Sequence, residues 1–426
     1  MRVFQTLLAF SGNAQPQLAV TRRLVERGHE VRVLAHRAAG ERVRATGAEL
    51  VAFEQVKPDL DLSRRETDSL RDWESRTRFG ASLRLVRNGL FAFVVAVNRE
   101  CAARLAEWRP EVVAYDWMLT GAGVAAEGAG LPAAALVHCP YPYPHPGAPP
   151  PYLGLRPLGG PLGRVRDGLL AAGQRRTLDR GVSLLNKARA EQRLAPLAHW
   201  QEQLLRAQEI HMLTAPELDL GGVGLPAQAR YVGPAFEPYE REWDSPWPAA
   251  NEDPLVVVSL STSYMNQAPL AQRILDALAP LPVRALLTSG PALAGESLRL
   301  PANARAVAYV AHRSVFPHAA LVISHAGWQT INAALADGVP LVCIPDGRDQ
   351  PDNAARVLAC GAGVRESKRA SPERLRAAIE RALADGRLRE RARAMAGALA
   401  RSDGASASAE ALERLAAGAR EGALRA

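Results

Sequence analysis

The sequence predicts an α/β protein made of two doubly wound halves, each built on a parallel sheet. Three observations support this prediction. Residues 1–54 alternate between strand and helix patterns, and a polar stretch with four Pro residues follows near mid-chain, at 238–254. The strand–helix alternation then restarts with the apolar run Leu255–Leu260. Because 426 residues are too many for one compact core, two domains are expected.

The strands of the first half are short, apolar, β-branched runs, as buried parallel strands are. Its helices show apolar faces, and the first closes at Gly28, a plausible C′ residue. The predicted elements are strand Arg2–Phe10, helix Gln15–Arg27, strand Glu30–Ala35, helix Gly40–Ala45, strand Glu49–Phe53, helix Ser82–Trp108, strand Val112–Tyr115 ending at Asp116, helix Gly121–Gly130, strand Pro132–Val137, helices Arg164–Leu185 and Ala188–Leu205, and strands Ile210–Leu213 and Arg230–Val232. The segment 138–163 is rich in Pro, Gly and Tyr without periodicity, and loops of that length are usually functional.

The second half repeats the pattern of the first. Its predicted elements are strands Leu255–Leu260, Arg284–Leu287, Ala304–Tyr309 and Leu321–Ile323, a further strand after the Gly-Val-Pro turn at 338–340, and helices Pro269–Leu278, Thr330 to near Gly338, Pro351–Ala359 and Pro372–Ala384. We therefore divide the chain into a Rossmann-like domain at 1–237, a linker at 238–254, a second Rossmann-like domain at 255–400, and a helical tail at 401–426 that ends in a surface helix. Ligands of open α/β sheets bind outside the carboxyl ends of the strands, so a cleft between the two sheets is expected.

Composition places the chain among ordinary globular proteins, with 48% hydrophobic and 23% charged residues. The net charge of +8 comes from Arg residues spread along the chain, which argues against a nucleic-acid partner. The N-terminus lacks a signal-peptide cleavage pattern, and no apolar run approaches the roughly 20 residues of a membrane span. We expect a cytoplasmic protein without stable membrane insertion.

No metal or resident cofactor is expected. The four cysteines lie far apart, with no metal-ligand spacing. Asp59-Leu60-Asp61 resembles a metal-binding DxD, but it lies in a charged surface stretch.

The stretch from Leu321 to Gln350 predicts an anion site. A buried strand is followed by the small-residue turn His325-Ala326-Gly327 and by a helix start. Free N–H groups and the helix dipole point outward from such a turn. His325, Gln329 and Thr330 add side-chain donors, so we interpret the turn as a diphosphate cradle.

The same stretch gives the chain its resemblance to a known family. The segments YVAHRSVFPHAALVISHAGWQT, GVP and DQPDNAARV stand in the order and spacing of the family 1 glycosyltransferases with the GT-B fold. ERGHEVRVLA, YVGP and LTSGP add to the likeness, which is strongest over residues 309–363 and to bacterial natural-product (macrolide and antibiotic) transferases. The resemblance implies an α/β GT-B fold, two Rossmann-like domains facing each other across a cleft, and a metal-independent, inverting transferase.

Carried onto this sequence, the family motifs imply a donor site for a nucleotide sugar, the cosubstrate. The diphosphate would lie at the HAGWQT turn, the sugar hydroxyls at the DQ pair, and the base at a backbone position. The implied donor-binding residues are Thr262, Val310, His325, Gly327, Trp328, Gln329, Thr330, Asp349 and Gln350. Asp349 and Gln350 could instead merely cap the helix at Pro351.

Two departures affect the donor site. Ser261 stands where a Gly is common in the loop that approaches the phosphates. Ala333 stands where plant members usually carry a Glu for the ribose hydroxyls. The second departure leans toward a dTDP-sugar over a UDP-sugar.

The sharpest departure concerns catalysis. Family members typically carry a His after the first strand as general base, oriented by an Asp after a later strand. The Asp matches Asp116, but the His position holds Asn13, which cannot take a proton near neutral pH. Removing a general base typically costs about 10²–10⁴-fold in rate.

Four interpretations of this departure stay open. Asp116 could act as the base itself, or the acceptor could already be nucleophilic. Another residue could act as the base from the segment 138–163, here called the acceptor loop, which contains His138 and His145. Alternatively the protein is inactive or needs a partner, and Asn13 only caps the helix near Gln15. Tyr141, Tyr143 and Tyr152 either line an acceptor pocket or only pack their loop.

The sequence thus predicts transfer of a sugar from an NDP-sugar to a small apolar acceptor, with Asp116 and Asn13 at the catalytic position and His138, Tyr141 and Tyr143 on the acceptor side. An epimerase of the same fold and a nucleotide-sugar-binding auxiliary protein are the alternatives. A homodimer is left open.

Overall fold

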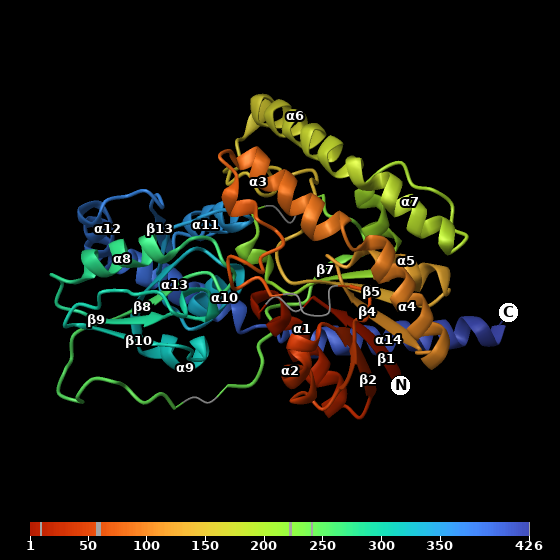
Figure 1. Cartoon of the computed structure of the whole chain (residues 1–426), viewed down its shortest axis with the longest axis horizontal. Coiled ribbons are helices and arrows are strands. Elements are labelled where there is room, and N and C mark those ends of the chain that lie inside the picture. The colour runs from red at the N-terminus through yellow and green to blue at the C-terminus, as the bar shows by residue number, and fades with distance from the viewer. Residues whose placement is uncertain (9–10, 57–60, 221–223, 240–241, 426) are drawn as a thin grey trace.

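The computed structural model describes the chain except residues 9–10, 57–60, 221–223, 240–241 and 426 (Figure 1). Two parallel sheets with helices on their faces form two domains. The first domain contains β1 (Arg2–Leu7), α1 (Ser11–Glu26), β2 (Glu30–Ala35), α2 (Gly40–Arg44), β3 (Glu49–Ala52), α3 (Arg78–Leu85), α4 (Val94–Trp108), β4 (Val112–Asp116), α5 (Thr120–Gly128), β5 (Ala133–Val137), α6 (Gly160–Leu178), α7 (Val182–Glu191), β6 (Glu209–Met212) and β7 (Ala229–Tyr231). Its sheet has the order β3-β2-β1-β4-β5-β6-β7.

The second domain has the sheet order β10-β9-β8-β11-β12-β13. Its elements are β8 (Leu255–Ser259), α8 (Ala268–Leu278), β9 (Arg284–Thr288), β10 (Ala304–Val307), α9 (His312–Val315), β11 (Ala319–Ser324), α10 (Trp328–Ala336), β12 (Leu341–Cys343), α11 (Gln350–Ala359), β13 (Gly363–Arg365), α12 (Pro372–Ala384) and α13 (Gly386–Leu399). The sequence analysis did not anticipate α9, β13 or α13, which are two short elements and an Arg- and Ala-rich helix.

The strand order reverses at two places, between β1 and β4 in one sheet and between β8 and β11 in the other. The strands on either side pair in parallel, Val3 with Val112 and Val322 with Val257. At such a switch point the loops after the two central strands diverge and leave room for a ligand. The fold thus directs attention to the residues after these four strands.

Two helix predictions in the first domain were wrong in their bounds. The single helix expected at Ser82–Trp108 consists of α3, a π-helical segment at Val86–Phe91, and α4. The pair expected at 164–205 consists of α6, which begins at Gly160, the shorter α7, and a 3₁₀ segment at Trp200–Arg206. Ala-, Arg- and Leu-rich sequence favours helix almost everywhere, so it marks ends poorly.

Among the described residues, the stretch Phe79–Trp108, which spans α3, the π-helical segment and α4, is long and apolar enough, by length and composition, to cross a membrane. The sequence analysis did not single it out. Its second half, α4, packs against α5 and α7, and Val97, Cys101 and Leu105 are buried there. Core helices of globular domains pass the same test of length and composition.

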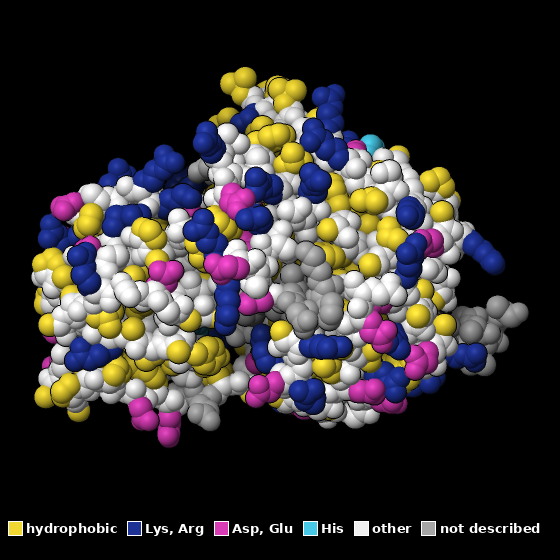
Figure 2. Space-filling model, viewed as in Figure 1, with side chains coloured by type: hydrophobic (Ala, Val, Ile, Leu, Met, Phe, Trp, Pro, Cys, Tyr) yellow, Lys and Arg dark blue, Asp and Glu magenta, His cyan; other side chains and the backbone are white. Residues whose placement is uncertain are grey.

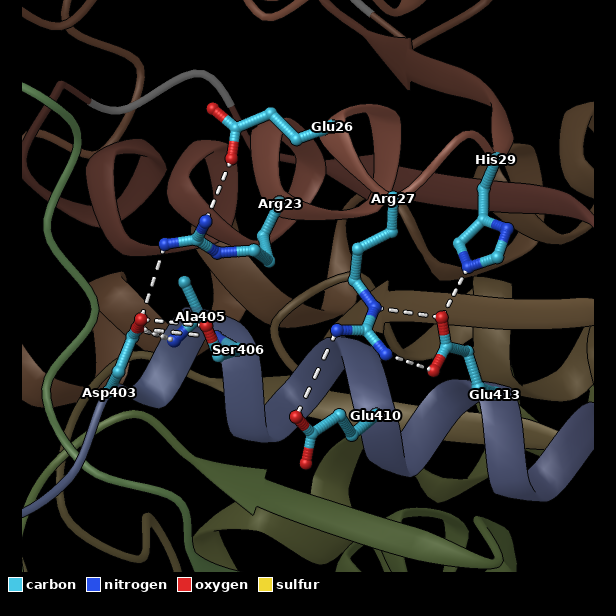
Figure 3. A network of polar contacts seen from close by, with 9 residues as sticks. All are labelled: Arg23, Glu26, Arg27, His29, Asp403, Ala405, Ser406, Glu410 and Glu413. Atoms are coloured by element: carbon cyan, nitrogen blue, oxygen red, sulfur yellow. Dashed lines mark hydrogen bonds and ion pairs between the residues drawn. The ribbon is translucent and has the colours of Figure 1, made fainter.

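The last helix, α14 (Gly404–Arg425), belongs to the first domain although it follows the second in sequence. Leu412 on α14 is fully buried in a core cluster with Leu18 and Leu24 of α1. Glu413 accepts two hydrogen bonds from Arg27, at 2.8 and 2.7 Å (Figure 3). The sequence indicated a surface helix here, whereas one face of α14 completes the core beside α1.

Candidate functional site

The turn after β11 holds His325 in a fixed and neutral state. Its Nδ1 lies 3.4 Å from the Ser259 carbonyl oxygen at the end of β8, and burial lowers the pKa of His325 to about 4. A Cβ on Gly327 would stand 2.5 Å from His325 Nε2, so only glycine lets the ring lie there. Ala326 has φ +66°, the left-handed geometry of a tight turn. The turn thus aims a neutral imidazole over the start of α10.

Helix α10 begins at Trp328, two residues earlier than predicted, with Gly327 as N-cap. A glycine offers no side chain to the first backbone N–H groups, which leaves them available to an anion. Trp328 and Thr330 are largely buried. Gln329 reaches away from the turn, and its Nε2 donates to the His138 carbonyl oxygen of the first domain at 3.0 Å. Gln329 therefore ties the anion turn to the acceptor loop.

The DQ pair lies at the start of α11 and is engaged within its own loop. Gln350 Oε1 accepts from the amides of Asp346 and Gly347, at 2.8 and 3.1 Å, and the side chain is buried. Asp349 Oδ2 accepts from Asn353 Nδ2 at 2.7 Å. Asp349 stands at the N-cap position without a side-chain cap bond, so simple capping does not account for it.

Thr262 and Val310, the two residues expected near the nucleotide, differ in how exposed they are. Thr262, in the loop after β8, is exposed, and its Cγ2 would lie 3.9 Å from a Cβ on Gly290. Val310 is half-buried against the core, whereas the neighbouring Tyr309 is 74% exposed. An exposed ring before Val310 leaves a face open for stacking.

In the first domain, Asp116 at the end of β4 is fully buried and well held. Its Oδ2 accepts a hydrogen bond from Gln17 Nε2 at 2.7 Å. Its Oδ1 accepts one from the Met118 amide at 2.9 Å. These two donors fix the direction of the carboxylate. The sequence analysis missed Gln17, whose only signal is its place one turn after Asn13.

The loop after β5 brings His138 to this carboxylate. His138 Nε2 lies 3.9 Å from Asp116 Oδ1 and has no hydrogen-bond partner among the described residues. Burial lowers the pKa of His138, while the carboxylates of Asp116 and Asp349 oppose that shift. The imidazole is therefore neutral near pH 7, and the two carboxylates stabilise the protonated form.

Asn13 lies inside the first turn of α1, which starts at Ser11. The hypothesis that Asn13 caps a helix beginning near Gln15 was therefore wrong. Its Nδ2 lies 3.9 Å from Met118 Sδ. The side chain that donates to the Asp116 carboxylate is that of Gln17.

Tyr141 and Tyr143 of the acceptor loop are buried and pack edge to face. Tyr143 lies 6.0 Å from Trp117 and 6.3 Å from Tyr141 between ring centroids, and Tyr141 meets His145 at 5.5 Å. The cluster forms an apolar surface beside Asp116, because its member Trp117 directly follows Asp116 in the sequence. Tyr141 and Tyr143 thus pack the loop, and they do so next to the candidate catalytic pair.

Two buried ion pairs join the domains around this region, and neither was visible in the sequence. Arg348 Nε and Nη2 donate to Asp72 at 3.0 and 2.9 Å, and Arg356 Nη2 lies 3.0 Å from Asp219. Arg348 directly precedes Asp349, so the pair anchors the DQ loop to the first domain.

The carboxylate of Asp352 adds a third link, because it accepts hydrogen bonds from the backbone amides of Tyr152 and Gly154 in the acceptor loop. A Cβ on Gly154 would stand 2.7 Å from Pro351 Cβ, so the two loops touch. The acceptor loop and the start of α11 therefore meet directly.

Within the described ranges, no group of three or more His, Cys, Asp or Glu side chains is placed to hold a metal ion. Asp59 of the DxD sequence lies outside the described residues. Asp61 accepts hydrogen bonds from Ser63 in its own turn.

Comparisons with known proteins agree with this geometry. Residues 272–415 match the model of the erythromycin biosynthesis protein CIII-like C-terminal domain. The chain is 27% identical to 4'-demethylrebeccamycin synthase of Lentzea aerocolonigenes over 397 residues, which are 91% of this chain and 93% of that protein. It is 31% identical to demethyllactenocin mycarosyltransferase of Streptomyces fradiae over 192 residues, 43% of this chain and 40% of that protein.

Solved structures share the whole architecture. The glycosyltransferase of kitacinnamycin superposes with a TM-score of 0.74 at 23% identity, over 97% of this chain and 98% of that one. The glycosyltransferase VinC in complex with dTDP gives 0.69 at 19% identity, over 98% and 99%. The two parallel-sheet domains and these matches define a GT-B glycosyltransferase. The chain is similar to the natural-product enzymes of glycosyltransferase family 1.

Proposed function

We propose that this glycosyltransferase moves a sugar from a nucleoside diphosphate sugar to a small apolar acceptor, with inversion at the anomeric carbon. The observation that supports this most is the meeting of the two half-sites at His138. Its carbonyl oxygen accepts from Gln329 of the anion turn, and its Nε2 faces Asp116.

Three features favour a nucleotide-sugar donor. The uncapped start of α10, with its free backbone N–H groups next to the His325 turn, is suited to a diphosphate. VinC and the spinosyn rhamnosyltransferase SpnG, with which the chain shares its fold, are each described with bound dTDP. Ala333 in place of a ribose-binding Glu also leans toward dTDP over UDP.

In the proposed mechanism the acceptor hydroxyl attacks the anomeric carbon in line with the departing diphosphate. The new C–O bond forms as the old one breaks, and its electron pair leaves with the nucleoside diphosphate. The hydroxyl proton passes to His138 Nε2, and Asp116 stabilises the resulting imidazolium. In this mechanism the backbone N–H groups at the start of α10, with His325 beside them, receive the developing charge on the diphosphate, and no metal takes part.

The test is nucleoside diphosphate release from dTDP- and UDP-sugars mixed with a panel of apolar aglycones. We expect release only when an acceptor is present, and a β-linked product from an α-linked donor by NMR. Release without any acceptor would point to an epimerase or hydrolase. A retained α-configuration would contradict the inverting mechanism.

A second test uses Asp116→Asn. We expect turnover to be lost while calorimetry still detects the donor, because the carboxylate acts on the acceptor side. Unchanged turnover would remove Asp116 from the mechanism.

One observation favours a second candidate, a nucleotide-sugar-binding auxiliary protein. Asn13 stands where relatives carry their catalytic His. If both the parent and the Asn13→His variant bind the donor but turn over no acceptor, this result would support the auxiliary function over the transferase function.

A further inference from the structure

Helix α6 presents an apolar face to solvent. Of its 19 residues only Gly163 and Leu178 are buried. Leu162, Val165 and Leu169 follow one another on one face, and they are 78%, 60% and 72% exposed. Leu158, in the segment leading into the helix, is 51% exposed, and its carbonyl lies against Gly163. An amphipathic helix normally turns such a stripe toward the core, so this face lacks its cover.

The helix is also basic. Arg164, Arg175 and Arg176 are exposed. At 3.6 residues per turn, Arg176 lies in line with the apolar stripe near the end of the helix, and Arg164 and Arg175 lie about a quarter turn beyond Val165, on the polar side. Within the described part of the chain, Arg166 is the one arginine of α6 with an ion pair, to Asp167 at 2.8 Å. Asp167 is also the only acidic residue within the helix. In Figure 2 hydrophobic and Lys or Arg side chains gather at the top of the view, where Figure 1 places α6.

We propose that α6 is a membrane-docking helix, which rests on the surface of an anionic lipid bilayer with Leu158, Leu162, Val165 and Leu169 inserted. Apolar side chains flanked by arginines are typical of helices that lie in a bilayer interface. The arginines complement anionic headgroups, and their long stems let the charges reach the interface while the stripe inserts.

The shape of the surface favours a bilayer over a protein partner. Three of the four side chains stand on a single, mostly unburied helix at the edge of the molecule, and Leu158 lies just before it (Figure 1). Such a ridge fits a deformable lipid surface, whereas a protein partner would need a matching groove. The centre of a protein interface is also poor in charged residues, and Arg176 lies at the end of this stripe. Because α6 continues from the acceptor loop, docking would hold that loop near the bilayer.

The experiment is flotation of the full chain with vesicles of phosphatidylcholine alone or mixed with phosphatidylglycerol, at low and high salt. We expect binding to the mixed vesicles only, weakened by salt. The double variant Leu162→Ser, Leu169→Ser should lose most binding, by about tenfold or more, and Arg175→Gln, Arg176→Gln should lose its salt-sensitive part. The matched control is Leu300→Ser, an exposed leucine of the second domain, which should bind as the parent does.

Insertion has its own readout. A Val165→Trp variant should be quenched by brominated lipid in mixed vesicles, whereas a Trp at position 300 should not. The proposal is overturned if the chain ignores anionic vesicles, or if Leu162→Ser, Leu169→Ser binds unchanged. It is also overturned if α6 packs against a second copy of the chain. In that case sedimentation would show a dimer, and the Leu162→Ser, Leu169→Ser variant would be a monomer.

Discussion

His138 Nε2 lies 3.9 Å from Asp116 Oδ1, both side chains are buried, and this nitrogen has no hydrogen-bond partner in the described part of the chain. In relatives with a His after the first strand, the same carboxylate would face that residue. Here the imidazole near Asp116 is that of His138, in the loop after β5, which follows Asp116 in the sequence instead of preceding it. In the proposed mechanism this pair provides the base, in place of the His that the family resemblance would put at Asn13.

The first prediction concerns this pair. His138→Gln keeps a polar side chain but removes the proton acceptor, so kcat should fall by about 10²–10⁴-fold while donor affinity by calorimetry stays the same. In the parent, log(kcat/KM) should fall as pH drops through the pKa of His138, which burial sets below 6.5, because only the neutral imidazole accepts a proton. This acid limb should be missing from the residual activity of the variant.

His145→Gln, in the same loop, is the matched control and should keep the parent kcat. Adding Asn13→His to His138→Gln should restore part of the activity, since position 13 faces Met118, whose amide binds Asp116. A His138→Gln enzyme with parent kcat would rule out His138 as the base.

The two sheets could be predicted from the sequence, whereas the approach of His138 to Asp116 could not. Buried parallel strands are short apolar runs, so β4, β8 and β9 were located within one or two residues of their observed ends. The ends of α6 and α7 were not, because no strong caps mark them. Asp116 was found through its strand end, but the position of His138 depends on how a Pro-rich loop folds.

Contacts between distant segments escaped the sequence for the same reason. Arg348 and Asp72 are 276 residues apart, and nothing in either local pattern pairs them. The HAGWQT and DQ motifs indicated which loops form the donor side. They did not indicate that Gln350 would bind its own loop, or that Gln329 would reach the first domain.

The second prediction concerns the Arg348–Asp72 pair. Both side chains are nearly buried, so Asp72→Ala leaves a guanidinium without its partner, and about 3–5 kcal/mol of stabilisation should be lost. We expect weaker donor binding and a larger radius of gyration by small-angle scattering, since the pair anchors the DQ loop to the first domain.

The double variant Asp72→Ala, Arg348→Met should recover much of that loss, because no buried charge then remains unpaired. Arg104→Ala, which breaks an exposed pair with Glu54, serves as the control and should change neither quantity. Additive effects of the two single changes would show that the pair contributes no coupling.

The third prediction concerns the docking of α14. Leu412→Ala removes a fully buried side chain between α14 and α1 and should cost about 2–5 kcal/mol of unfolding free energy of the first domain. The exposed Arg414→Ala on the same helix should change it by less than about 0.5 kcal/mol. Equal urea midpoints for the two variants would mean that α14 contributes little to the core.

The last prediction concerns acid stability and His36. This side chain is fully buried, neither ring nitrogen has a hydrogen-bond partner among the described residues, and burial lowers its pKa from 6.5 to about 4. Between those two values the unfolded chain binds a proton that the folded chain does not. Stability should therefore be full above pH 6.5 and fall as pH drops toward 4, by at most roughly 3 kcal/mol for this group.

His36→Leu should remove that share of the loss, so its urea midpoint should fall less than the parent's between pH 6.5 and 4. The exposed His318→Leu serves as the control and should follow the parent curve. His312 and His325, whose pKa values burial also lowers to about 4, remain in both variants, so a pH dependence persists in each. Parallel curves for His36→Leu and the parent would show that His36 is protonated equally in the folded and unfolded chains, contrary to its burial.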